Sequence, residues 1–135
     1  TQALRDIKDL SLEFRAVWTT EKNQPNLNFK IYDKTIDQEY DILNSFGGSI
    51  ADIISFPLRV WFLTKWNPPM SKILVLDENF KFISTDDRDK LAQFIKNVSE
   101  KLGIQIILVT HSDEISSSAS KVFRVIKRGD RSYVE

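Results

Sequence analysis

An apolar run that ends in two acids constrains the fold of this chain more than any other part of its sequence. The four residues Ile73–Leu76 are all apolar, and Asp77 and Glu78 follow them directly. A short continuous run of this kind is typical of a strand that is buried on both faces, as in a parallel sheet. Two carboxylates at the end of such a strand need a metal, a partner or a reaction to offset the cost of their charge. The function therefore depends on which other residues lie near Asp77 and Glu78 at the end of this strand.

A helix and a second strand follow the two acids. The helix is expected to begin at Ser84 or Thr85, either of which can cap it, and to end at Gly103. Its apolar stripe comprises Leu91, Phe94, Ile95, Val98 and Leu102. The run Ile104–His111 is typical of another buried strand. Strand, helix and strand in this order predict a right-handed βαβ unit with parallel strands.

The remaining segments complete a single predicted domain that covers residues 1–135. Apolar residues at helical spacing predict a helix over 1–18, a candidate for the end of a coiled coil. We expect a polar loop over 19–26, a strand around 27–31 and a return strand over 36–43. A glycine-bearing turn and an apolar helix span 45–65, and Pro57 should kink the helix or mark its first turns. The apolar stripe expected along one side of this helix comprises Ile50, Ile53, Ile54, Leu58, Trp61 and Phe62. A β-hairpin is expected over 122–134, turning at 128–130. The predicted fold class is α/β, with a largely parallel sheet, flanking helices and a C-terminal β-hairpin.

Composition excludes several classes of protein. The formal net charge is +0, so no overall field draws the chain toward nucleic acid or membrane. There is no cysteine, which excludes disulfides and cysteine-based zinc sites and favours a reducing compartment. No apolar run approaches the length of a membrane span. We therefore expect a cytoplasmic protein, and, because the chain begins without Met, a fragment of a longer one.

Three residues with chemical potential fall at the carboxyl ends of the two predicted parallel strands. They are Asp77 and Glu78 on the first strand and His111, the only histidine of the chain, on the second. Ligands of open parallel sheets bind beyond those ends. Neighbouring side chains of a strand point to opposite faces, so Asp77 and Glu78 should have different roles. One can hold a metal while the other addresses a water or a substrate.

At this point the residues resemble known motifs. "ILVLDE" resembles a Walker B motif, and "ILVTH" resembles the switch-histidine strand of ABC-type ATPases. "SFGGSIADIISFPLR", Ser45–Arg59, resembles the signature motif and signature helix of that family. The order of the three motifs is the order found in the family. The chain is thus similar to the C-terminal lobe of an ABC-type ATPase head of the SMC and RecF-like DNA-repair branch. "LDENFKFIS" is most like the phage and bacterial version of that branch.

The resemblance implies a P-loop NTPase-like lobe, with the signature motif and helix over 45–65 and the Walker B to switch-histidine segment over 72–111. It implies ATP and Mg²⁺ as nucleotide and cofactor, and hydrolysis at a head–head dimer interface. Asp77 would hold Mg²⁺, through a water. Glu78 would orient the attacking water, and His111 would contact the γ-phosphate.

The resemblance also assigns the signature residues. Gly47 and Gly48 would bring backbone N–H groups at a helix N-terminus to the γ-phosphate of a nucleotide bound by a partner molecule. Ser45 or Ser49 would supply a hydroxyl, and the register between them stays open. Ser84 falls at the D-loop position.

The chain departs from the family pattern at several positions. Phe46 stands where a serine is usual, Ser49 where Gln or Glu is usual, Asn79 where proline is common, and Ser84 where the D-loop has an aspartate. There is no GxxxxGK[ST] motif, so the phosphate-binding loop must come from a separate N-terminal Walker A lobe. Without that lobe we expect no activity. The other implied partners are a second head, DNA and a nuclease subunit, with no membrane.

Two alternatives come from other classes of function. A Mg²⁺-dependent nuclease of the Toprim type would use Asp77 or Glu78 with the acids Asp86, Asp87 and Asp89. A non-catalytic interaction module would use none of these side chains for chemistry.

Overall fold

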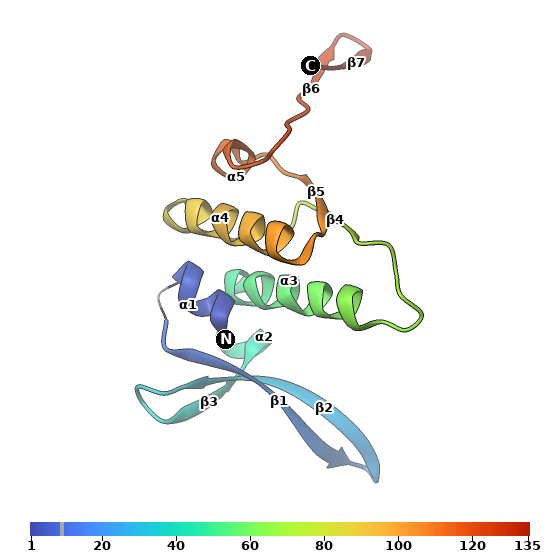
Figure 1. Cartoon of the computed structure of the whole chain (residues 1–135). Coiled ribbons are helices and arrows are strands. Elements are labelled where there is room, and N and C mark those ends of the chain that lie inside the picture. The colour runs from blue at the N-terminus through green and yellow to red at the C-terminus, as the bar shows by residue number, and fades with distance from the viewer. Residues whose placement is uncertain (9) are drawn as a thin grey trace.

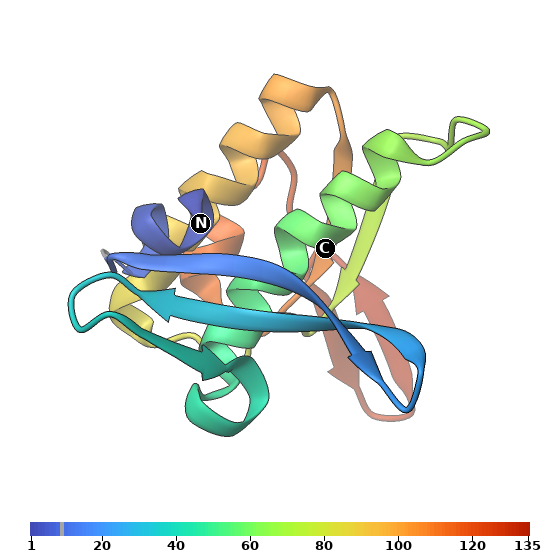
Figure 2. The same cartoon turned by 90° about the horizontal axis from the view of Figure 1, so that it is seen from below.

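The computed structural model describes residues 1–8 and 10–135, and two long helices form its middle layer (Figure 1). In chain order the elements are α1 (Gln2–Lys8), β1 (Leu12–Glu21), β2 (Gln24–Asp33), β3 (Gln38–Asp41), α2 (Ile42–Ser45), α3 (Gly48–Lys65), β4 (Ile73–Asp77), α4 (Thr85–Leu102), β5 (Gln105–Val109), α5 (Asp113–Ser117), β6 (Val125–Arg128) and β7 (Arg131–Val134). The antiparallel sheet β1–β2–β3 lies beneath α1 and α3, as Figure 2 shows from below. No helix in the described part of the chain is both long enough and apolar enough to span a bilayer.

The predicted βαβ unit and the α/β fold class are confirmed, but the prediction of a largely parallel sheet is wrong. Among the described residues only β4 and β5 pair in parallel, whereas β1–β2–β3 and β6–β7 are antiparallel. Strands β4 and β5 pair in parallel, with Leu76 beside Leu108 and Asp77 beside Val109. Helix α4 joins them, beginning after Ser84 and ending at Gly103, whose left-handed backbone has φ 61°. Glycine adopts that conformation without the penalty a β-carbon brings. The register places the carboxyl ends of both strands at one edge.

The prediction that these strands are buried on both faces is wrong for this chain. Leu76 is fully buried in the core, whereas Val75 is 59% exposed and Val109 is 51% exposed. The pleat sends alternate residues to opposite faces, and only the face that carries Leu76 packs against the core. Among the described residues, no element covers the opposite face, which presents four apolar side chains: Ile73, Val75, Ile107 and Val109.

The N-terminal helix is much shorter than predicted. Helix α1 ends at Lys8, Asp9 lies outside the described residues, and β1 begins at Leu12. The spacing of apolar residues did not distinguish a helix from a strand here, because residues 12–21 form a strand only through their pairing with β2. Phe14 stacks on Phe29 across that pair, with ring centroids 5.5 Å apart. The expected end of a coiled coil is therefore absent from the described residues 10–18.

The predicted loop over 19–26 is instead a tight hairpin turn between β1 and β2. Lys22 and Asn23 form it, and both have positive φ, 49° and 60°. Two positive φ values match the backbone twist that joins antiparallel strands. The strand predicted around 27–31 is confirmed within β2, but its return strand β3 ends at Asp41 because α2 begins at Ile42. The C-terminal hairpin is confirmed, and it stands away from the rest of the chain (Figure 1).

Helix α3 supplies much of the core. Ile50, Ile53 and Ile54 are buried as predicted. The same stripe was expected to include Trp61 and Phe62, and that part is wrong, because each is 54% exposed. Pro57 lies inside α3 without ending it. Phe56 is buried instead and meets Phe80 and Phe94 edge to face.

One partly buried ion pair joins α1 to α4. The Lys8 ammonium lies 2.6 Å from Oδ2 of Asp87, and the Ser84 hydroxyl bonds to the same carboxylate. Burial alone would raise the pKa of Asp87, but the hydrogen bonds from Lys8 and Ser84 outweigh it and hold that pKa below its ordinary value. A lowered pKa in the folded state means that the pair stabilises the fold above the ordinary pKa of an aspartate and loses this contribution as the pH falls through the lowered value.

Replacing Lys8 by Met should therefore lower the free energy of unfolding at neutral pH by about 1–2 kcal/mol, because it removes a charged hydrogen bond from a partly buried carboxylate. Urea unfolding of both proteins, followed from pH 7 to pH 3, measures the difference. It should shrink toward zero at the acid end. An undiminished difference at low pH would show that the Lys8 stem, rather than its charge, is what α4 needs.

Candidate functional site

The two parallel strands position the candidate site at their carboxyl ends. Asp77 is the last residue of β4. The next residue, Glu78, donates its backbone N–H to the carbonyl oxygen of Val109 at 3.0 Å, which extends the pairing by one step. The backbone of Glu78 then turns with φ 46°, a left-handed conformation that residues other than glycine rarely adopt. This turn leads the chain out of the strand toward α4.

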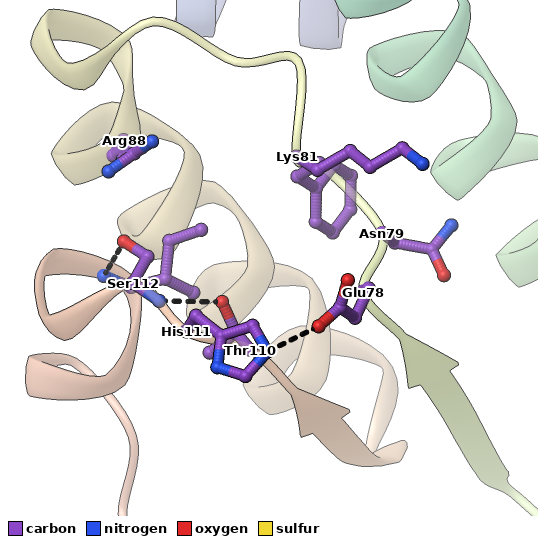
Figure 3. Close-up of a pocket in the computed structure, with 9 residues that line it drawn as sticks. Glu78, Asn79, Lys81, Arg88, Thr110, His111 and Ser112 are labelled. Atoms are coloured by element: carbon purple, nitrogen blue, oxygen red, sulfur yellow. Dashed lines mark hydrogen bonds and ion pairs between the residues drawn. The ribbon is translucent and has the colours of Figure 1, made fainter.

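Glu78 and His111 meet across the two strand ends. Nε2 of His111 lies 2.6 Å from Oε1 of Glu78, and the two side chains point toward one another in Figure 3. The side chain of His111 is 90% exposed and that of Glu78 is 48% exposed. A pair so open to water adds little to stability. Its value lies in geometry, since it places a carboxylate and an imidazole at one point that a ligand can reach.

Asp77 stands apart from this pair. It is exposed at the end of β4 and does not line the pocket that contains Glu78 and His111. That the two neighbouring acids have different roles stays a prediction.

A pocket of about 230 Å³ surrounds the Glu78–His111 pair (Figure 3). That volume is below the range of pockets that enclose a drug-sized ligand. Its lining carries both signs of charge, with Lys81 from the segment after β4 and Arg88 from α4 beside the pair. The full lining is Glu78, Asn79, Phe80, Lys81, Arg88, Thr110, His111, Ser112 and Ile115.

Hydrogen bonds hold the wall of this pocket formed by α4 and α5. Ser112 caps α5, since its hydroxyl oxygen accepts from the Ile115 N–H at 3.3 Å. The same hydroxyl donates to Glu114 at 2.6 Å, and Arg88 lies 3.4 Å from that carboxylate. The Ser112 hydroxyl, followed by the backbone N–H of Glu114 itself and then by the Arg88 guanidinium, holds the pKa of Glu114 below its usual value. The Ser112 N–H also donates to the Thr110 hydroxyl at 3.1 Å, which braces the segment beside His111.

The predicted signature residues lie at the start of α3, outside that pocket. Gly47 caps the helix, and Gly48 is its first residue. A β-carbon on Gly47 would meet nothing within 4 Å, whereas one on Gly48 would lie 2.5 Å from Cδ2 of Phe82. Gly48 is thus needed for packing within this chain. Ser45 is exposed and Ser49 is partly buried, and the structure does not decide which of them takes the predicted role.

The D-loop position is engaged within the chain. Ser84 caps α4 by its backbone, and its hydroxyl bonds to Asp87 instead of accepting from a helix N–H. The Asp87 carboxylate also forms an ion pair with the Lys8 ammonium. This arrangement bears on the nuclease alternative. Among the residues that the structure describes, no group of three or more acids and histidines is placed to hold a metal ion.

A magnesium ion held mainly by nucleotide phosphates needs fewer ligands from the protein. Mg²⁺ in such sites keeps several waters and takes one or two carboxylates. The exposed carboxylate of Asp77, beside Glu78, fits that donor set. It does not fit an all-protein cage.

Sequence reasoning missed Asp52 and Phe82. Phe82 lies against Gly48 at the start of α3, and Asp52 lies four residues further along that helix, where its buried Oδ2 has no hydrogen-bond partner among the described residues. The available signal was an acid inside the apolar stripe of α3: Asp52 lies four residues after Gly48 and four before Phe56. Arg88 was also missed, because one arginine on an exposed helix face carries no local signal.

In sequence, the chain is similar to DNA repair ATPases. The chain is 30% identical over 117 residues to a DNA double-strand break repair Rad50 ATPase of Thermoplasma volcanium. It is 30% identical over 118 residues to the protein of that name from Archaeoglobus fulgidus. These matches cover 78% and 86% of this chain, and each spans 13% of the relative. A shorter match, 33% over 58 residues, covers 43% of this chain and 13% of the spermidine/putrescine import ATP-binding protein PotA of Mesomycoplasma hyopneumoniae.

Solved structures with this fold are heads of SMC proteins. The head domain of the Pyrococcus yayanosii Smc protein superposes with a TM-score of 0.74 over 99% of this chain and 25% of that one, at 16% identity. A chain from work on ATP-driven dimerization of SMC ATPases gives a TM-score of 0.70, covering 100% of this chain and 78% of that one, at 19% identity. No protein-family model matches the chain. The sequence relatives and the fold together identify this chain as a fragment of an ABC-type ATPase head of the SMC and Rad50-like kind.

Proposed function

We propose that this chain is the C-terminal lobe of an ATPase head that hydrolyses ATP at a head–head dimer interface. The observation that carries the proposal is the pair formed by Glu78 and His111, 2.6 Å apart at the ends of adjacent parallel strands. ABC-type relatives in sequence and SMC heads in fold support it. The chain spans 13% of the Rad50 relatives it matches, so the activity belongs to a larger assembly.

In this proposal Glu78 orients the attacking water and accepts its proton. Phosphoryl transfer needs mainly positioning and neutralisation of charge, so one well-placed carboxylate suffices as the base. His111 contacts the γ-phosphate, and its exposure leaves it open to a nucleotide held by another lobe. Lys81 and Arg88 add positive charge to the same pocket.

Asp77 is the residue proposed to hold Mg²⁺. The ion, when bound with ATP, neutralises charge on the phosphate oxygens. Asp77 binds it through a water from the end of β4, outside the pocket that Glu78 lines. The two acids therefore do not compete for one ligand.

We propose that the Walker A lobe packs on the exposed apolar face of β4 and β5. Ile73, Val75, Ile107 and Val109 line it. Apolar surface of this kind contributes about 25 cal/mol for each Å² removed from water. The strands of that lobe would extend the sheet at its edge, and its helices would cover the exposed face. It would also bring the missing phosphate-binding loop beside Glu78.

The dimer is proposed to form through the N-terminal end of α3. Gly47 is exposed and unobstructed, so backbone N–H groups at this helix end can reach a nucleotide held by a second head. Ser45 or Ser49 supplies the hydroxyl there, and Ser84 lies at the D-loop position. Because the curated relatives are named as double-strand break repair ATPases, we propose work on DNA in repair or recombination at the nucleoid, with a nuclease subunit as partner. The phage or bacterial origin suggested by "LDENFKFIS" is part of the same proposal.

The proposal is tested by reconstitution. The 135-residue chain by itself should show no ATP hydrolysis above the buffer rate, because no phosphate-binding loop is present in its sequence. Mixing it with the Walker A lobe of its own head should give a rate of roughly 0.01–1 per second, the range of slow NTPases with their catalytic parts in place. Phosphate release measures both rates.

The matched control is the same mixture in which the Walker A lysine of the added lobe is replaced by Ala. It should remain inactive. Hydrolysis by the chain alone, or an inactive mixture whose lobes bind each other, would contradict the proposed function.

A further inference from the structure

The backbone around His111, rather than packing of its ring, determines where the imidazole lies. The side chain is 90% exposed and meets the Glu78 carboxylate at 2.6 Å. Residues 110–112 form the loop between the end of β5 at Val109 and the start of α5 at Asp113, and they belong to neither a strand nor a helix. A side chain with so little packing depends on the backbone that carries it. The contacts that fix this loop therefore position the imidazole.

The residue after His111 is bound through both its backbone and its side chain. The Ser112 N–H donates to the Thr110 hydroxyl at 3.1 Å, so the two neighbours of His111 are joined to each other (Figure 3). The Ser112 hydroxyl accepts from the Ile115 N–H at 3.3 Å and donates to Oε2 of Glu114 at 2.6 Å. A change in the backbone of the loop would strain or break these bonds.

Arg88 joins this loop to α4. Its Nη1 lies 3.4 Å from Oε2 of Glu114, the same oxygen that the Ser112 hydroxyl contacts. Helix α4 is 18 residues long and buries Leu91 and Ala92 in the core, so it is a firm support. Helix α5 has only 5 residues, too few to be stable without contacts to the rest of the chain. The loop that precedes α5 therefore depends on the contacts that α5 makes with α4.

The gain in stability from the Arg88–Glu114 contact is small. The side chains of Arg88 and Glu114 are 28% and 37% exposed, and ion pairs so open to water add little to the free energy of unfolding. The contact does fix geometry beside the candidate site, because Arg88 also lines the pocket that contains Glu78 and His111. We call Arg88, Glu114 and Ser112 the His111 clamp.

We propose that Arg88 is a positioning residue that acts through Glu114 and Ser112 to hold His111 beside Glu78. Its catalytic consequence rests on the proposed function. The competing interpretation is that Arg88 binds the nucleotide directly from the same pocket. The structure favours positioning, because the guanidinium already contacts the carboxylate that holds Ser112. The two interpretations differ in the role of Glu114, which positioning requires and direct binding of the nucleotide does not.

The first arm of the test needs no nucleotide. His111 is the only histidine of the chain, so the NMR signals of its imidazole are assigned without ambiguity. In the 135-residue chain, Arg88→Met should shift these signals toward their position in Glu78→Ala, which lacks the pair. The amides of Ser112 and Ile115 should exchange with solvent about tenfold faster, because their hydrogen bonds are loosened. Imidazole signals that stay in place would overturn the inference.

Two further substitutions of cations on α4 serve as controls. Arg88→Lys should retain most of the wild-type signal positions and exchange rates, because a single nitrogen of Arg88 makes the contact with Glu114. Lys96→Met is the matched control, since Lys96 is an exposed cation on α4 that does not line the pocket. It should change neither the imidazole signals nor the amide exchange.

Glu114→Met keeps the inference testable if Arg88→Met does not fold. It breaks the same contact from the side of α5, so it should shift the His111 signals in the same direction as Arg88→Met. A Glu114 variant with wild-type imidazole signals would overturn the inference.

The second arm measures ATP hydrolysis after the Walker A lobe is added. Arg88→Met and Glu114→Met should each lower kcat about tenfold with KM for ATP nearly unchanged, because small displacements of a group that contacts the reacting phosphate are costly. In a His111→Ala background neither should lower kcat further, since both act through His111. A loss confined to Arg88→Met, with a raised KM, would show direct binding of the nucleotide and overturn the inference.

The inference and the proposed function fail in different ways. Shifted imidazole signals in both Met variants, with a wild-type head that hydrolyses no ATP, would support the His111 clamp and overturn the proposed function. Unshifted signals in both variants, with a wild-type head that hydrolyses ATP, would overturn the His111 clamp and leave the proposed function standing.

Discussion

Glu78→Gln should nearly stop ATP hydrolysis by the reconstituted head and should trap an ATP-bound dimer. Gln preserves the size of the side chain, so the nucleotide, the lobe interface and the contact with His111 should survive. What is lost is a carboxylate that can accept a proton from water, and general bases contribute about 10²–10⁴-fold to rate. We expect kcat to fall by about that factor while KM changes little. Phosphate release gives the rate, and gel filtration with ATP gives the mass of the head.

The control for this variant is Glu100→Gln, the same exchange on the exposed face of α4. It should hydrolyse ATP at the wild-type rate and should not accumulate as a dimer. Normal hydrolysis by the Glu78 variant would refute its assignment as the base, even if the head remained an ATPase. A fall in kcat without dimer accumulation would separate the chemical role of Glu78 from the proposed dimerisation.

Phe56→Ala should be among the most destabilising single changes in the chain. Phe56 is buried and meets Phe80 at 5.9 Å and Phe94 at 6.1 Å between ring centroids. Removing it leaves a cavity between α3, α4 and the segment after β4. Large-to-small changes of a buried phenylalanine cost about 3–5 kcal/mol. A small domain has about 5–15 kcal/mol of stability in all, so the variant should unfold at a much lower urea concentration.

Phe62→Ala is the matched control on the same helix. Phe62 is 54% exposed and contacts Trp61, so its loss should cost well under the Phe56 value, about 1 kcal/mol or less. Urea unfolding followed by circular dichroism measures both. Similar costs for the two variants would show that the α3–α4 contact around Phe56 is not the packed core described here.

Much of the central unit could be predicted from sequence. The strand at Ile73, the helix to Gly103 and the second strand all carry local signals: a short apolar run, caps and 3.6-residue periodicity. The N-terminal region could not be predicted, because Phe14 lies four residues after Leu10, which is a helical spacing, and two after Leu12, which is a strand spacing. There the choice was made by Phe29 on the facing strand, which no local pattern reveals.

The candidate site divides in the same way. The order of residues along the chain was enough to place Glu78 and His111 at the ends of neighbouring parallel strands, and the structure brings them to 2.6 Å. The same reasoning could not find the contact between Phe56 and Phe80, because these residues lie 24 positions apart in the chain. Nor could it find the reason for Gly48, which is the ring of Phe82.

The sequence by itself determined the βαβ unit and the chemistry at its strand ends, because periodicity, capping and parallel topology act over short distances or through simple rules of chain connection. Only the tertiary structure decided which faces are covered and how the Glu78–Ser84 segment is held. One face of β4 and β5 remains exposed, and Phe80, which has a left-handed backbone, packs against Phe56 of α3. Both depend on which surfaces meet, and that follows from the packing of distant elements, which local sequence does not encode.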